Sequence, residues 1–510
     1  MKLERLCAAA NISCPTGRGD EVAAICTDSR TVVPDSLFIC IPGIHTDGHT
    51  CVAQAVANGA RWVLTQEGYG FERLPDVVYL QAPDTRRASA ILYDAFYGFP
   101  SRKMKFVGVT GTNGKTTVTH LLRSILEANL SKCGLIGTVG CESAGRVLEN
   151  RMYNRLANMT TPDPSELYRM LSEMADDGVE YVLMEVTSHA LALGKLEPLT
   201  FEAAIFTNLT PEHLDFHHTM DAYADAKAEL FAKSKLSILN LDSPYASRMR
   251  ARAAGRFVTC SVLHPDADYR AEAVQIKGKS GVQYVLRSDH SRMTVQCGVP
   301  GAFNVMNSMQ AAICAAELGV GAATIKIALA SVTGVRGRME RMRLGVNADF
   351  SVIIDYAHTP DALEKLLRTA RDLCERNQRV VLVFGCGGDR DRGKRPLMGA
   401  VASRYADDVI VTSDNSRSED PETIIREILE GMDPQKPCRV IPDRKSAIRE
   451  AVLTAKKGDL ILLAGKGHEE YEITKEGRKP FFEREIVLSA FAERQKERQK
   501  DEGKNRQKES

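Results

Sequence analysis

The feature that most constrains this fold is an apolar run followed at once by a polar, glycine-rich or charged turn. Four such runs follow residue 350, and they read SVIIDYAHTP, RVVLVFGCGGDRD, DDVIVTSDNSRSED and DLILLAGKGHE. Strand-like runs that alternate with helical segments predict a parallel sheet covered by helices on both faces. Ligands of such open sheets bind beyond the carboxyl ends of the strands, so a binding site is expected in these four turns.

The 510 residues are too many for one hydrophobic core, and three α/β domains are expected. Turn signals place a small N-terminal domain at 1–100, a central phosphate-loop domain with a parallel sheet at 101–334, and a Rossmann-like domain at 335–490. The remaining segment, 491–510, is almost wholly polar and is expected to be a solvated helix end followed by a disordered tail.

The composition excludes several classes of protein. Apolar residues make up 44% and charged residues 26% of the chain, as in ordinary globular proteins. A formal net charge of +1 argues against a nucleic-acid-binding protein. No apolar run is long enough to cross a membrane, and the first residues lack the apolar run of a signal peptide. The 13 cysteines are scattered and form no C-x-x-C pair, which is typical of reduced thiols in the cytoplasm.

A glycine-rich phosphate loop is expected within Val107–Thr117, which reads VGVTGTNGKTT. It lies between a strand-like run and an amphipathic helical segment, the context in which backbone N–H groups bind phosphate. Lys115 is expected to contact the β- and γ-phosphates, and Thr116 to ligate Mg²⁺. Val109 stands where the strict pattern has glycine, so Gly111 supplies the turn. The loop alone indicates a nucleoside triphosphate and no particular reaction.

Further motifs occur in order from Thr27 to Glu469, and together they resemble the Mur ligase family. Any one of them is weak, whereas the ordered set is specific. They are TDSR at 27–30, DGH at 47–49, GTNGKTT at 111–117, TTPD at 160–163, EVTSHAL at 185–191, NLTPEHLDFH at 208–217, YADAK at 223–227, GAFNVMN at 301–307, GRME at 337–340, DYAHTPDAL at 355–363, GCGGDRDRGKRP at 385–396 and GKGHE at 465–469.

The resemblance implies an ATP-dependent ligase of peptidoglycan synthesis, with Mg²⁺ as cofactor. ATP phosphorylates a carboxylate, an amine attacks the acyl phosphate, and ADP and phosphate leave. The implied partners are ATP, UDP-MurNAc-L-Ala-D-Glu and meso-diaminopimelate, with L-lysine as the alternative amino acid. A cytoplasmic monomer is expected, with no bound nucleic acid and no membrane insertion.

The same resemblance assigns metal and nucleotide residues. Glu185 follows a strand-like run, where a carboxylate suits an oxygen-liganded metal, and His213 is implied as a further ligand. Lys227 is implied to carry a carbamate, which turns a cation into an anion that ligates Mg²⁺. The implied catalytic residues are Lys115, Glu185, His213, Lys227 and Arg338. The implied ATP-binding residues are Gly111, Thr112, Asn113, Gly114, Lys115, Thr116, Thr117, Asn304, Arg338, Asp355 and His358.

The nucleotide-linked acceptor is assigned to the N-terminal and central domains. Small hydroxyl side chains suit this role because they donate to oxyanions without crowding them. The TTPD segment also fits a helix N-cap, and both roles are compatible. The implied contacts are Ser29, Ile44, His45, Thr46, Thr160, Thr161, Ser188 and Lys195.

The added amino acid is indicated by DNSR at Asp414–Arg417, where diaminopimelate enzymes usually have DNPR. Diaminopimelate is lysine with an extra carboxylate, which arginine binds through two parallel hydrogen bonds. Arg417 therefore favours diaminopimelate, while serine in place of proline leaves lysine open. Asp414 and Glu469 are expected to hold the distal ammonium group. The implied contacts to the amino acid are Arg390, Asp414, Asn415, Ser416, Arg417, Gly465 and Glu469.

Three other classes are weighed against this interpretation. One of them, a non-enzymatic nucleotide-binding module, is disfavoured by the many acidic and basic residues at the strand ends. Another ligase of the same fold, such as folylpolyglutamate synthase or the alanine-adding Mur enzyme, is disfavoured by TDSR with DGH and by DNSR with GKGHE. A phosphate-loop ATPase that acts as a switch would hydrolyse ATP without an acceptor. The chain shows no guanine-reading N-K-x-D motif after the loop.

Overall fold

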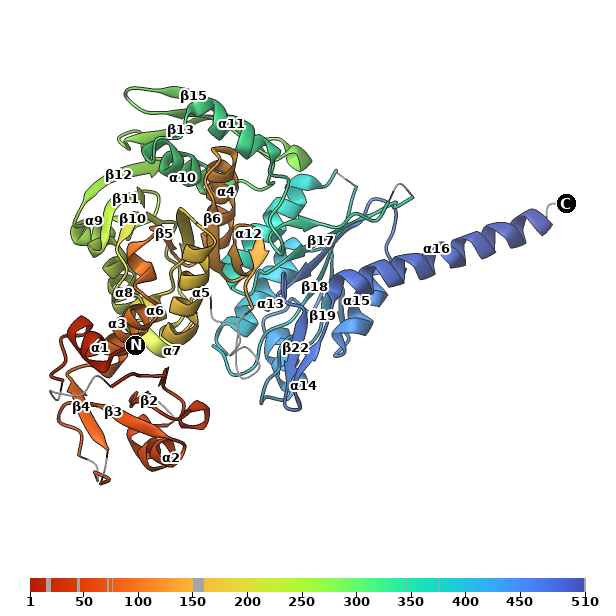
Figure 1. Cartoon of the computed structure of the whole chain (residues 1–510). Helices are drawn as coiled ribbons and strands as arrows, with labels where there is room; N and C mark the ends of the chain where they lie inside the picture. The colour runs from red at the N-terminus through yellow and green to blue at the C-terminus, as the bar shows by residue number, and fades with distance from the viewer. Residues whose placement is uncertain are drawn as a thin grey trace. The chain divides into compact units, whose positions relative to one another are not determined.

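The computed structural model describes residues 1–14, 20–43, 46–70, 73–75, 77–149, 160–345, 347–375 and 377–508. The side chains of Lys279 and of residues 499–508 are not among those described. The chain divides into two compact units, Met1–Leu209 with Thr219–Thr259 and Thr210–His218 with Cys260–Ser510. Both units are α/β, and Figure 1 shows their elements. The expected domain limits at residues 100 and 334 do not coincide with these units and stay a prediction.

The first unit opens with a small parallel sheet of order β1-β2-β3-β4. Its apolar side chains, among them Leu37, Trp62 and Leu64, are fully buried. The Asp84 carboxylate caps the third helix by accepting from two backbone N–H groups, which fixes where that helix begins. The elements are α1 (Leu3–Ala9), β1 (Ala24–Cys26), η1 (Ser29–Thr31), β2 (Ser36–Ile39), η2 (Gly48–Cys51), α2 (Val52–Ala57), β3 (Ala60–Gln66), β4 (Val78–Ala82), α3 (Thr85–Phe96) and η3 (Pro100–Arg102).

A second sheet of this unit has the order β11-β10-β5-β9-β6-β7-β8. Its first five strands are parallel, and the expected phosphate loop joins β5 to α4. The apolar positions of α4, such as Val118 and Ile125, are fully buried, which confirms the amphipathic helix. The elements are β5 (Lys105–Thr110), α4 (Lys115–Ala128), β6 (Cys133–Gly137), β7 (Gly140–Ser143), β8 (Arg146–Val147), α5 (Pro164–Asp176), β9 (Tyr181–Glu185), α6 (Ser188–Ala192), β10 (Phe201–Phe206), α8 (Met220–Ala232), β11 (Ser234–Asn240) and α9 (Ala246–Arg252).

The second unit contains an antiparallel meander with two helices. Strand β12 leads into it across the boundary between the units, and β13, β14 and β15 follow in order. The elements are α7 (Leu214–His217), β12 (Arg256–Ser261), β13 (Tyr269–Ile276), η4 (Gly278–Ser280), β14 (Val282–Arg287), β15 (Arg292–Cys297), α10 (Phe303–Glu317) and α11 (Ala322–Ser331).

The rest of the second unit is a sheet of order β16-β17-β21-β18-β19-β20, and all neighbours but β16 are parallel. Its strands β17, β18, β19 and β21 are the four apolar runs expected from the sequence, so the doubly covered parallel sheet is confirmed. The elements are β16 (Glu340–Arg341), β17 (Ser351–Asp355), α12 (Pro360–Leu373), β18 (Val380–Phe384), α13 (Lys394–Tyr405), β19 (Asp408–Val411), α14 (Pro421–Leu429), β20 (Cys438–Val440), α15 (Arg444–Leu453), β21 (Leu460–Ala464), β22 (Tyr471–Thr474), β23 (Gly477–Pro480) and α16 (Glu483–Lys508).

A helix extends into the C-terminal polar segment, where the sequence led us to expect a solvated helix end. Helix α16 continues to Lys508. The segment is rich in glutamate, arginine, glutamine and lysine, which are all good helix formers. Disorder after this helix end stays a prediction. Among the described residues, no helix is both long enough and apolar enough to cross a membrane.

A buried arginine joins helices α13 and α14. Arg395 is fully buried, and its two terminal nitrogens donate to both oxygens of Glu419 at 2.9 and 2.8 Å. It also donates to Glu427 at 2.6 Å. The hydrogen bond from Arg395 is the main reason that the pKa of Glu419 falls from 4.5 to about 2.

We predict that Glu419→Gln lowers the melting temperature by roughly 2–4 °C at neutral pH. Because the folded-state pKa is depressed, Glu419 stabilises the fold above pH 4.5 and loses this effect as the pH falls toward about 2. Melting curves across this window should therefore converge for variant and wild type. Exposed Glu422→Gln, in the first turn of α14, is the control. Parallel curves for Glu419→Gln would contradict the prediction.

Candidate active site

The phosphate loop is shaped by glycine and by the end of β10. Gly111 has φ +145°, and a Cβ there would overlap the Thr207 hydroxyl. Thr207 Oγ1 donates to the carbonyl of Asn113 at 2.6 Å, and the N–H of Asn113 donates to Asn208 Oδ1 at 3.0 Å. Lys115 Nζ lies over the loop and donates to the carbonyl oxygen of Gly111 at 2.8 Å. The supporting pair Thr207 and Asn208 was not predicted, although it stands directly after a strand-like run.

Glu185 lies at the centre of the loop's polar contacts. The residue is 2% exposed, ends β9, and stands beside Val109 of β5 in the sheet register. Its carboxylate accepts from Thr116 Oγ1, from the N–H of Thr138 and from Thr138 Oγ1, each at 2.9 Å. The sequence assigned Glu185 and Thr116 each to the metal, and the structure brings their side chains together. It missed Thr138, whose one signal is that it follows the strand-like run 133–137.

The chemistry of this oxygen set fits a hard divalent cation. A carboxylate and a threonine hydroxyl within hydrogen-bonding distance present the oxygen ligands that Mg²⁺ prefers. Among the described residues, no group of three histidine, cysteine, aspartate or glutamate side chains forms a metal site. A magnesium site here would therefore rely on Thr116 and Glu185, with phosphate and water oxygens or a modified Lys227 as further ligands.

Lys227 also lies next to the phosphate loop. It is 2% exposed on α8, its Nζ donates to the carbonyl oxygen of Gly111 at 3.1 Å, and it lies 4.7 Å from the centre of the Tyr223 ring. A buried lysine amine next to the phosphate loop is placed where a modification would change the loop's charge.

The expected acceptor contacts are partly brought together. Thr161 Oγ1 donates to the backbone carbonyl of Glu185 at 2.9 Å, and Thr160 Oγ1 lies 3.0 Å from Thr138 Oγ1. Asp163 makes no side-chain cap to its helix and instead pairs with Lys195 at 2.7 Å.

The remaining acceptor residues lie at the start of α6, in the N-terminal part of the chain, or outside the described residues. Ser188 is buried at the start of α6. Ser29 Oγ donates to Gln54 Oε1 at 2.7 Å, while Thr46 is exposed. Ile44 and His45 lie outside the described residues.

Residues expected to bind ATP also occur in the second unit. Asp355 accepts from the N–H groups of Met339 and Ala357 at 2.7 Å each, and burial raises its pKa. The Arg338 guanidinium lies 4.7 Å from the centre of the Tyr356 ring.

The expected asparagine and histidines of this unit are held by neighbours. Asn304 is buried, and its amide donates to the carbonyl oxygen of Pro300 at 2.6 Å. Glu212 lies between two histidines, 3.7 Å from His213 and 3.3 Å from His358. Glu212 was not predicted as a partner of either.

The loops after β19 and β21 form a compact polar cluster. Asp414, Asn415 and Glu469 are all buried, and Asn415 Nδ2 donates to Glu469 Oε2 at 2.8 Å. Gly465 has φ +116°, and a Cβ there would overlap the Asp414 carboxylate, so only glycine allows this approach. Burial, assisted by Asp414, raises the pKa of Glu469.

Two guanidinium groups lie beside this cluster. Arg417 Nη1 donates to the backbone carbonyls of Gly388 at 2.7 Å and Asn415 at 3.3 Å. Partial desolvation and the nearby charge of Arg417 together lower the pKa of Arg390. Two cations that disfavour one another in this way would be stabilised by a bound carboxylate.

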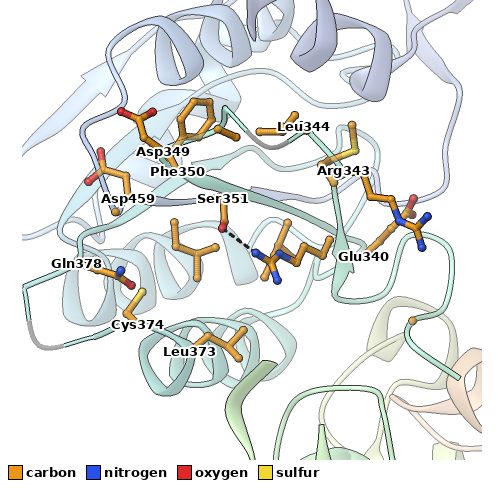
Figure 2. A pocket seen from close by; sticks show the side chains of 18 of the residues that line it. Glu340, Arg343, Leu344, Asp349, Phe350, Ser351, Leu373, Cys374, Gln378 and Asp459 are labelled. Atoms are coloured by element: carbon orange, nitrogen blue, oxygen red, sulfur yellow. Dashed lines mark hydrogen bonds between the residues drawn. The ribbon is translucent and has the colours of Figure 1, made fainter. Parts of the chain in front are cut away.

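A pocket of about 960 Å³ opens elsewhere on the second unit, at the amino ends of β17 and β21. None of the described residues that line it was expected in a binding site. Figure 2 shows Glu340, Arg343, Leu344, Asp349, Phe350, Ser351, Leu373, Cys374, Gln378 and Asp459 around it. The residues expected to bind the nucleotide and the amino acid follow the carboxyl ends of these strands, so they lie at the opposite edge of the sheet from this pocket.

Three family models match the chain in the order of its sheets. They are the Mur ligase family catalytic domain at residues 21–93, the Mur ligase middle domain at 109–315, and the Mur ligase glutamate ligase domain at 337–467. The chain belongs to the Mur ligase family. This family consists of ATP-dependent ligases, and the three-domain α/β architecture expected from the sequence is confirmed.

Curated relatives are similar over nearly their whole length. A UDP-N-acetylmuramoyl-L-alanyl-D-glutamate–2,6-diaminopimelate ligase of Geobacillus thermodenitrificans is 42% identical, over 94% of this chain and 96% of the relative. An enzyme of the same name from Clostridium acetobutylicum is 39% identical, over 97% and 98%. A solved structure with this name is 31% identical with a TM-score of 0.66, over 97% of this chain and 100% of that chain.

A more distant structure supports the fold alone. It is the MurF ligase of Thermotoga maritima in complex with ADP, which is 17% identical with a TM-score of 0.61. The match covers 94% of this chain and 99% of that chain.

We predict that Gly111→Ala weakens ATP binding at least tenfold, because an alanine at this φ costs about 1–3 kcal/mol and its methyl group collides with Thr207. The matched control is Gly140→Ala, which has φ +139° but nothing within 4 Å of its Cβ. Calorimetric titration with ATP measures both. Equal affinity loss in the two variants would contradict the role assigned to the collision.

Proposed function

We propose that this chain ligates meso-2,6-diaminopimelate to UDP-N-acetylmuramoyl-L-alanyl-D-glutamate, with ATP as the co-substrate. The observation that carries this proposal is the pairing of two sites in one chain. In the first, Thr116 of the phosphate loop donates to the buried carboxylate of Glu185. In the second, the buried acids Asp414 and Glu469 lie beside the two arginines Arg417 and Arg390. Near-full-length relatives that are about 40% identical carry the name of this reaction. A monomeric enzyme in the cytoplasm is the form we expect.

The first site activates the acceptor. A carboxylate resists attack by an amine because oxide is a poor leaving group, and phosphorylation by ATP replaces it with phosphate. Lys115 and the loop N–H groups hold the transferring phosphate, and Arg338 provides a fixed fork of donors for its charge. Bound Mg²⁺ would neutralise charge on the phosphates, with Thr116, Glu185, His213 and carbamylated Lys227 as its proposed ligands. Ser29, Thr160, Thr161, Ser188 and Lys195 are the proposed acceptor contacts.

The second site selects the amine. The acid pair Asp414 and Glu469 matches the distal ammonium group, which lysine and diaminopimelate share. Only diaminopimelate adds a carboxylate, and Arg417 with Arg390 supplies its counter-charge. We therefore favour diaminopimelate over L-lysine. An ATPase switch would have no use for this second site.

The deciding experiment offers the purified chain UDP-MurNAc-L-Ala-D-Glu, ATP and either diaminopimelate or L-lysine, and determines the product by mass spectrometry. We expect one new amide with diaminopimelate, with ADP and phosphate released only when the acceptor is present. Phosphate release without acceptor would favour the switch, and a lysine product would overturn the choice of amino acid.

We predict that Arg417→Ala raises the KM for diaminopimelate about ten- to a hundredfold, because a carboxylate in the site loses its charged partner. The KM for ATP should stay unchanged. Exposed Arg426→Ala on α14, which contacts Thr423, is the matched control. Initial rates at varied amino acid measure the effect, and an unchanged KM for diaminopimelate in Arg417→Ala would remove the argument for this substrate.

We predict that Lys227→Ala loses nearly all activity while it still binds ATP. A small carboxylic acid, such as formate or acetate, should restore part of the rate by filling the cavity with an anion. Lys235→Ala serves as the control, because Lys235 is exposed and pairs only with Glu202 among its described contacts. Full activity of Lys227→Ala without added acid is the outcome that excludes the carbamate.

A further inference from the structure

Lys466, the lysine of GKGHE, is a buried cation with no role in the site described so far. It follows β21 and is 0% exposed. A lysine is almost never fully buried unless its charge is paired, because an isolated ammonium group is costly to remove from water. Its contacts therefore identify the groups that pair with its buried charge.

The Lys466 ammonium group contacts both expected amino-acid loops. Nζ donates to Asn415 Oδ1 and to the carbonyl oxygen of Tyr471, each at 2.9 Å. It also lies 3.6 Å from Asp414 Oδ1 and 3.8 Å from Glu469 Oε2. Among the described residues, every side chain in this set is one that the amino-acid site uses.

The contact to Asn415 fixes which way its amide points. Asn415 Oδ1 accepts from Lys466 and from the N–H of Ile473 at 3.0 Å. With its oxygen held by two donors, the amide directs its NH₂ group to Glu469, at 2.8 Å. Tyr471 donates to the other oxygen of Glu469 at 3.1 Å. The orientation of Glu469 thus depends on Lys466 through one intermediate.

The charges around the acid pair leave room for one more cation. Arg444 is also fully buried, but its Nε donates to Glu483 at 2.8 Å, so its charge is shared with a third carboxylate. Asp414 and Glu469 both pair with Lys466. Burial alone would raise the pKa of Asp414, yet Lys466 and Arg444 hold it below its usual range. The groups that face the two carboxylates are Lys466, Arg444, Arg417, Asn415, Tyr471, Tyr356, Cys386 and the carboxylates themselves.

We propose that Lys466 is a positioning residue of the amino-acid site, which holds Asn415, Asp414 and Glu469 in the arrangement that receives the ammonium group of the incoming amino acid. This inference rests on the proposed ligase function. It assigns to Lys466 no contact with the substrate, since the side chain is fully buried and contacts Asn415 and the two carboxylates.

The test compares Lys466→Met with wild type and with Lys445→Met, a change at an exposed lysine on α15 of the same unit. We expect the KM for diaminopimelate to rise about ten- to a hundredfold, while the KM for ATP and for the UDP-linked dipeptide stays within about twofold. The rise should be largest at low pH. Without Lys466 the pKa of Glu469 moves further above 4.5, so more of it is protonated and unable to hold an ammonium group.

Lys466→Arg provides the second variant if Lys466→Met does not fold. It keeps the charge but not the geometry, so we expect a raised KM for diaminopimelate with the wild-type pH profile. A purely structural role would lower the melting temperature and change all three KM values together, or none, and either result overturns the proposal. If wild type ligates L-lysine instead, the choice of amino acid in the proposed function fails, but the same split must then appear in the KM for lysine.

Discussion

The structure depends on the contact between the end of β9 and the phosphate loop. Parallel register places Glu185 beside Val109, and the loop that leaves β5 then brings Thr116 within 2.9 Å of its carboxylate. A buried carboxylate is stable only when its oxygens accept hydrogen bonds, and Thr116 and Thr138 supply three of them. The same oxygens that satisfy the fold are therefore those that a divalent cation would use, so the stability of the loop and its chemistry rest on one group.

In the second unit, buried carboxylates are likewise stabilised by their neighbours, but by a charged side chain instead of by hydroxyl groups. The loops after β19 and β21 place Asp414 and Glu469 at the carboxyl edge of a parallel sheet, where both are buried. Two buried acids repel one another, and a single buried lysine only partly offsets them. A buried site that retains unbalanced negative charge binds a cation selectively, because the cation supplies the counter-charge that water cannot supply there.

Strands and motifs that depend on residues close together in the chain were predicted from the sequence. Contacts between residues far apart in the chain were missed. The runs that became β17, β18, β19 and β21 were visible because apolar residues and turns alternate at strand length. The phosphate loop was visible because glycine and lysine stand at fixed spacing. Thr138, Lys466 and Arg444 were missed because each acts through a partner more than 30 positions away in the chain, for which spacing gives no signal.

The serine of DNSR illustrates how the two kinds of information combine. From the sequence, loss of proline at Ser416 frees the backbone and weakens the case that Arg417 is positioned for a carboxylate. Arg417 nevertheless has φ +52°, a conformation that a non-glycine residue adopts only when its surroundings hold it. Its N–H donates to the carbonyl oxygen of Ile473 at 3.1 Å, and the N–H of Ile473 donates back to Asn415. Hairpin β22–β23 thus fixes the loop that proline would otherwise stiffen, and the guanidinium group keeps its place beside the acid pair. Under the proposed function, the choice between diaminopimelate and lysine would then depend on the two arginines, since the acid pair would serve either amino acid equally.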